Sequence, residues 1–289
     1  MHSMLVLAAL ISFFCDRFLC LRWIFYSSSV SSFVVASLYR LLEAPLPLGL
    51  RLLSVSLLSS VFPGVVFFIA YYANLVLYLA LLVFLYLLLI PFHAFISDYN
   101  CILSSSSNKA SDKISPWVEL CGSELLDENE SDLNLTLTVG IIFERLVVAP
   151  LVWSIILGPL GGLLYFFSYK TKVFADSHNL GASLFDVYFE WLDWIPSRFL
   201  IFMMCLLTSF SHFFNRVTWG ISPSVSNNSK KFLLSSLSLF QADLTNLLPD
   251  SGENPVDGVY PSARLIRRVY QGIVVVFAVL LIIQGTILF

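Results

Sequence analysis

The sequence predicts an all-α fold, a polytopic transmembrane helix bundle of about five to six spans, some of them kinked or broken. Of the 289 residues, 58% are hydrophobic and only 12% are charged, whereas soluble domains are about 25% charged. Apolar stretches of about 20 residues, the length that crosses a bilayer, alternate with polar segments along the chain. We therefore expect residues 1–289 to form a single integral membrane domain with the lipid bilayer as a partner.

The first apolar stretches occupy the amino-terminal third. Residues 1–19 are apolar but lack the basic start and the small-residue cleavage site of a signal peptide. They predict a retained short span or a re-entrant segment. Residues 50–71 and 73–95 follow one another almost directly, which predicts a tight transmembrane hairpin. The Phe62-Pro63-Gly64 sequence should kink its first helix, because proline removes a backbone donor.

Three more stretches complete the spans, at residues 139–169, 187–214 and 269–289. The first is long enough to cross with tilt or a break, and its proline and glycine residues predict a broken or kinked helix. In the stretch at 187–214, Pro196 is a residue that suits the first turn of a helix. We therefore expect a helix to begin near Pro196, with Asp193 close to its cap. The predicted helix-breaking or packing residues are Pro150, Gly158, Pro159, Gly161 and Pro196.

Two polar segments separate the spans. Residues 98–138 form an acidic loop or a short helical insertion, and residues 215–268 contain an amphipathic helix at 232–248. With six crossings and the amino terminus outside, the cytoplasmic segments carry 12 of the 16 Lys and Arg residues. This bias follows the positive-inside rule. It predicts a multi-pass membrane protein with these segments in the cytoplasm.

Charged residues inside the predicted spans form the candidate site. Ionisable groups at membrane depth are costly, and a functional role is the default hypothesis for them. Glu190 and Asp193 are three residues apart, so they share one face of a helix. A purely structural ion pair that fastens two helices is the alternative, and the sequence leaves both open. The five candidates are Glu144, Arg145, Glu190, Asp193 and Arg198.

Other chemistries find little support in the sequence. The five cysteines form no CxxC pair, and the four histidines show no metal-binding spacing, so we expect no metal and no cofactor. The glycine-rich sequence at 158–162 lacks the lysine and spacing of a phosphate-binding loop. The net charge of −3 indicates no nucleic-acid partner. The sequence shows no internal repeat of the kind found in many transporters, so a transporter is disfavoured.

Two sequences in order, "FERLVVAPLVWSIILGPLGGLLYFFSY" and "LDWIPSRFL", resemble the AmpE-like membrane proteins, which are related to the CobD/CbiB membrane proteins of cobalamin biosynthesis. The resemblance is concentrated in residues 139–200. The matching positions are Phe143, Arg145, Ala149, Pro150, Gly158, Pro159, Gly161, Tyr165, Leu192, Asp193, Trp194, Pro196 and Arg198.

This resemblance implies a multi-pass signalling or regulatory protein of the bacterial inner (cytoplasmic) membrane, linked to β-lactamase induction and cell-wall recycling. Arg145, Asp193 and Arg198 would line a polar pocket, to which Glu144 and Glu190 contribute. Its ligand would be a small cell-wall-derived molecule or another phosphate or carboxylate, and its cytoplasmic segments would meet a protein partner. The alternative is a membrane enzyme like CobD/CbiB, which joins aminopropanol to a corrinoid carboxylate by an amide bond. The Asn-containing motifs of that branch are absent before residue 139, which disfavours it.

Overall fold

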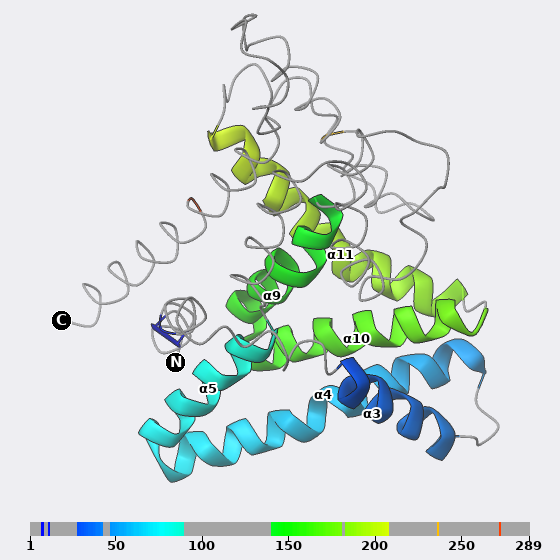
Figure 1. The fold of residues 1–289 in the computed structure, drawn as a ribbon, viewed down its shortest axis with the longest axis horizontal. Helices are drawn as coiled ribbons and strands as arrows, with labels where there is room; N and C mark the ends of the chain where they lie inside the picture. The colour runs from blue at the N-terminus through cyan, green and yellow to red at the C-terminus, as the bar shows by residue number, and fades with distance from the viewer. Residues whose placement is uncertain are drawn as a thin grey trace, which may run out of the picture.

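The computed structural model describes residues 7, 8, 11, 28–42, 47–89, 140–180, 183–207, 236 and 272. Every element in these ranges is a helix (Figure 1), which agrees with the predicted all-α class. Most of the first apolar stretch lies outside the described residues. So do the acidic segment at 98–138, nearly all of the polar segment at 215–268 with its amphipathic helix, and nearly all of the last predicted span.

The first described helix, α3 (Ser28–Leu41), lies in a segment for which we expected no span. It packs against α4 and α10, and Arg51 of α4 fastens its carboxyl-terminal end. The Arg51 Nε donates a hydrogen bond to the Tyr39 carbonyl at 3.1 Å. The Arg51 guanidinium also lies 3.7 Å from the centre of the Tyr39 ring. These contacts are local to two helices and have no periodic signature in the sequence.

Helices α4 (Leu48–Ala73) and α5 (Leu75–Leu89) form the predicted hairpin. Only Asn74 separates them, and its side-chain oxygen accepts the backbone N–H of Val76 at 2.8 Å, which caps α5. Helix α4 continues through Pro63 without interruption. Two described helices, Leu48–Ala73 and Gly140–Leu157, are long and apolar enough to cross a membrane. The predicted total of five to six spans includes segments outside the described residues.

Large apolar side chains cover the outside of the hairpin. They would be costly in water as a continuous patch but are ordinary in lipid. The exposed residues include Val61, Val65, Val66, Phe68, Ile69, Tyr72, Leu75, Val76, Leu77 and Phe84.

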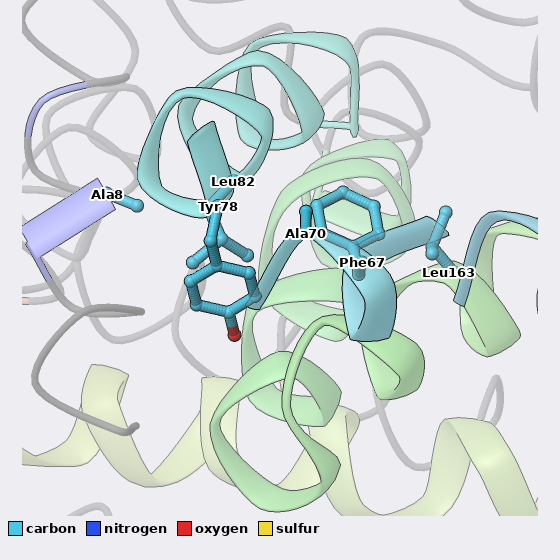
Figure 2. Packing of buried hydrophobic residues seen from close by; sticks show 6 residues of the cluster. All are labelled: Ala8, Phe67, Ala70, Tyr78, Leu82 and Leu163. Atoms are coloured by element: carbon cyan, nitrogen blue, oxygen red, sulfur yellow. The ribbon is translucent and has the colours of Figure 1, made fainter. Parts of the chain in front are cut away.

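The hairpin packs on α10 through a small apolar core. Figure 2 shows Phe67 and Ala70 of α4 between Leu163 of α10 and the pair Tyr78 and Leu82 of α5. Further along α4, Ser56 shares a hydrogen bond of 3.1 Å with Ser168 of α10. Small side chains let the two helices approach closely, as is common where helices associate in lipid. Helices α4 and α10 accordingly run side by side in Figure 1.

The predicted break in the segment at 139–169 occurs at Gly158. Its backbone has φ 75° and ψ −164°, a conformation that is essentially restricted to glycine. The chain changes direction there, so α9 (Ala149–Leu157) rises toward α11 in Figure 1 while α10 (Pro159–Ser177) runs across the molecule. Gly161 allows this turn to close, because a Cβ at 161 would collide with the backbone of Trp153. A helix break at Gly158-Pro159 is therefore confirmed.

Pro150 does not break the helix. The preceding residues instead form a π-helical turn, η2 (Glu144–Val148), in which the N–H of Ala149 bonds to the carbonyl of Glu144. A π turn shifts the hydrogen-bond ladder from four to five residues, and such turns are frequent at functional sites. It lies next to a proline that cannot donate, and it contains two of the five predicted site residues.

Helix α10 extends eight residues beyond the predicted span end at 169, and α11 (Ser183–Leu207) begins four residues earlier than expected. Lys172 joins the two across the turn. Its Nζ donates to Asp176 of α10 at 2.7 Å and to Asp186 of α11 at 2.8 Å. The segment between the predicted spans at 139–169 and 187–214 is thus largely helical.

Replacing Lys172 by methionine should lower the free energy of unfolding by about 1 kcal/mol or less, because all three groups are partly exposed. Burial lowers the pKa of Lys172, but the hydrogen bonds and charges of Asp176 and Asp186 raise it more, so its pKa lies above the ordinary 10.5. The stabilisation is therefore present below 10.5 and is lost as the pH rises through the raised value. Thermal unfolding in detergent at neutral and strongly alkaline pH checks this. A cost that persists at alkaline pH would contradict it.

Candidate functional site

Pro196 lies inside a continuous α11, so the expectation that a helix begins there is wrong. Asp193 is accordingly in the middle of the helix and not at a cap. Proline at 196 cannot donate to the carbonyl of Leu192, one turn earlier. The indole N–H of Trp153 on α9 donates to that carbonyl instead, at 2.9 Å. A donor from another helix thus replaces the missing one and joins α9 to α11.

The same stretch of α11 brings Asp193 against two other helical elements. Tyr165 of α10 donates its hydroxyl proton to Asp193 Oδ1 at 2.6 Å, and Arg145 Nε of η2 lies 3.7 Å from Asp193 Oδ2. Tyr165 is fully buried, and Asp193 is only 6% exposed. The carboxylate is therefore held by a short hydrogen bond on one side and by a looser ion pair on the other, since 3.7 Å exceeds hydrogen-bond range.

Glu144 is the second buried carboxylate beside this pair. It is 2% exposed and lies close enough to Asp193 and Arg145 to interact with both charges. Its Oε1 is buried and has no hydrogen-bond partner among the described residues. We call Glu144, Arg145, Tyr165 and Asp193 the buried polar cluster.

Aromatic rings surround the guanidinium of Arg145. Its central carbon lies 5.7 Å from the ring centre of Tyr169 and 6.0 Å from that of Phe189. Tyr165 and Tyr169 stack with 6.5 Å between their centres, and Phe189 lies about equally close to both. These rings exclude water, so charges within the cluster act on one another more strongly than they would at a surface.

Arg198, predicted as a pocket residue, contacts its own helix. Its guanidinium lies 4.2 Å from the Trp194 ring centre and donates to the Trp194 carbonyl at 3.2 Å. Trp191 is largely exposed. The indole nitrogen of Trp194 is buried and has no hydrogen-bond partner in the described part of the chain. Glu190 is half-buried, one turn before Asp193 on α11.

The structure thus brings together three of the five candidates, Glu144, Arg145 and Asp193. Arg145 and Asp193, 48 positions apart, were expected to line one pocket, and the structure places them 3.7 Å apart. Tyr165, Tyr169, Phe189 and Trp153 were not proposed as site residues. Tyr165 is a position of the family pattern, which was the one available signal for it. The others are ordinary aromatic residues in apolar stretches and carry no local signal.

Chemically, the cluster can hold charge and respond to it. It has two carboxylates, one guanidinium and one phenol in a water-poor environment. In the described residues no group of three or more His, Cys, Asp or Glu side chains is arranged to hold a metal ion. An anion could compete with Asp193 for Arg145, and a cation could associate with Glu144.

Comparison with known proteins identifies the family. The model of the family described as "Regulatory signalling modulator protein AmpE" matches residues 46–288. The chain belongs to the AmpE family. No curated protein and no solved structure matches the chain. The AmpE match includes all the described helices from α4 onward and all four residues of the buried polar cluster.

Proposed function

We propose that this AmpE-family chain is a multi-pass regulatory protein of the bacterial inner membrane that acts in β-lactamase induction and cell-wall recycling. The family description, a regulatory signalling modulator, supports the general role. Two helices of spanning length and the apolar outer face of the α4–α5 hairpin support the location. The basic residues of the expected cytoplasmic segments support an orientation with the amino terminus outside.

The observation that carries the proposal is the ion pair between Arg145 and Asp193, buried where three helical elements meet. Gly140–Leu157, α10 and α11 all contribute to the cluster, so a change in its charges is felt by every one of them. At 3.7 Å, the ion pair with Asp193 holds Arg145 less tightly than a bidentate pair would. A regulatory protein needs an element with two arrangements, so that a ligand can shift the equilibrium between them.

The signal we propose is a small anion, a carboxylate or phosphate of a cell-wall-derived molecule. This anion would replace Asp193 as the partner of the Arg145 guanidinium. The ligand-free and ligand-bound arrangements would then differ in how η2 packs on α11. A ligand shifts such an equilibrium only through unequal affinity for the two states, which this exchange supplies. The expected cytoplasmic segments would convey the change to a protein partner. The matching family is the regulatory one, so no observation favours the amide-forming alternative.

Removing the gene from a strain that encodes it should lower β-lactamase activity after challenge with an inducer by several-fold. Expression of the chain from a plasmid should restore that activity. The measurement is hydrolysis of a chromogenic β-lactam by cell extracts, with and without inducer. Unchanged induction in the deletion strain would contradict the proposed function, and membrane fractionation of the expressed chain tests its location separately.

A further inference from the structure

The buried polar cluster has an imbalance that Arg145 alone does not correct. It contains two buried carboxylates, Glu144 and Asp193, and one guanidinium, that of Arg145, which lies 3.7 Å from Asp193. If both are ionised, the cluster carries one uncompensated negative charge in a region where an unpaired charge is strongly destabilising. A charge of this kind is ordinarily neutralised by a proton or a bound ion.

Glu144 is where the imbalance is located. Asp193 already has Tyr165 on one oxygen and Arg145 beside the other. Glu144 is buried to the same degree, yet its Oε1 lacks a hydrogen-bond partner among the described residues. A buried acceptor left without a partner is destabilising, and more so when it is charged. The arrangement therefore provides a ready position for one positive charge.

We propose that the cluster binds one monovalent cation, a proton or Na⁺, at the carboxylate of Glu144. Among the described residues, Glu144 interacts with Arg145 on its own turn, Tyr165 on α10 and Asp193 on α11, while Tyr169 lies beside Arg145 and Glu190 beside Asp193. Only one of these is a cation, and its ion pair is with Asp193. Binding of the cation neutralises the cluster and weakens the electrostatic attraction between its carboxylates and Arg145. This inference rests on the proposed function only for its regulatory meaning.

The two cations are distinguished on the purified full chain in detergent micelles. Thermal unfolding is followed between about pH 6 and pH 8, in NaCl or in choline chloride at equal ionic strength, for the native chain and for Glu144→Gln. If a proton binds, the folded state holds more protons than the unfolded state, so stability rises as the pH falls. The melting temperature should then rise by about 2–4 °C per pH unit relative to Glu144→Gln, equally in both salts.

If Na⁺ binds, NaCl but not choline chloride raises the melting temperature of the native chain, and Glu144→Gln does not respond. Asp186→Asn is the matched control, because it removes a carboxylate from α11 outside the cluster and should respond as the native chain does. Identical dependence on pH and on Na⁺ in the native chain and Glu144→Gln would overturn the proposal.

If Glu144→Gln fails to fold, a second measurement, on the native chain, tests the proposal. Dicyclohexylcarbodiimide reacts with protonated carboxyl groups in apolar surroundings. The carboxyl oxygen bonds to the carbodiimide carbon, the proton passes to nitrogen, and an acyl shift gives a stable N-acylurea. Peptide mapping should find Glu144 labelled, with labelling that falls at higher pH or in Na⁺. No label at Glu144, or labelling indifferent to pH and Na⁺, would overturn the proposal. Neither measurement depends on β-lactamase induction, so the proposal and the proposed function can fail independently.

Discussion

Replacing Asp193 by alanine should lower the free energy of unfolding by about 3–5 kcal/mol, the largest effect we expect from one substitution in the buried polar cluster. The alanine leaves the guanidinium of Arg145 buried without its carboxylate, and it leaves the hydroxyl of Tyr165 without its acceptor. Denaturant unfolding in mixed micelles, followed by tryptophan fluorescence, measures the change.

Two further variants separate the effect of the Asp193 charge from that of losing any carboxylate on α11. Asp193→Asn keeps an acceptor for Tyr165 and removes only the charge, so it should cost less than Asp193→Ala. Asp186→Asn removes a partly exposed carboxylate from the same helix and should cost about 1 kcal/mol or less. If Asp193→Ala proves as mild as Asp186→Asn, the cluster does not stabilise the bundle as described.

Replacing Trp153 by phenylalanine should lower the free energy of unfolding by about 1–3 kcal/mol, the cost of a buried carbonyl that loses its hydrogen bond. Leu192 is buried, and Pro196 cannot supply the missing N–H. The indole of Trp153 is the donor that replaces it. Phenylalanine keeps an aromatic ring in place and removes that donor.

The double variant tests the explanation itself. Alanine at 196 has a backbone N–H that can reach the carbonyl of Leu192 within α11. Pro196→Ala should therefore recover much of the stability lost in Trp153→Phe, while giving little gain in the native background, where the carbonyl already has a partner. Equal effects of Pro196→Ala in both backgrounds would show no coupling between positions 153 and 196. The indole would then not be the compensating donor.

The helices could be predicted from the sequence where the signal is local. The hairpin at Asn74 follows from two long apolar stretches with almost nothing between them. The break at Gly158 follows from a glycine next to a proline, of which the first adopts a backbone conformation that other residues rarely allow. Helix α3 was missed because it is shorter than a membrane span and contains several serines.

The misplaced helix start at Pro196 has a tertiary cause. Proline usually ends or begins a helix because a backbone carbonyl loses its donor, and the sequence does not reveal that Trp153, 43 positions earlier, supplies one. The cluster shows the same limit. The charges Glu144, Arg145 and Asp193 could be selected because charge is rare within spans. Tyr165 is one of many aromatic residues in apolar helices, and only the packing of α10 against α11 brings its hydroxyl to Asp193.

The most direct test of the account is β-lactamase induction per folded molecule by chains with Asp193→Asn or Asp186→Asn, each expressed in the deletion strain. Asp193→Asn keeps the shape of the side chain and the acceptor for Tyr165 but removes the charge that pairs with Arg145. We predict that it folds, at a yield measured by size-exclusion chromatography, and that it fails to restore induction, whereas Asp186→Asn restores it fully. Induction at the native level by a folded Asp193→Asn chain would contradict the claim that the buried polar cluster performs the regulatory function.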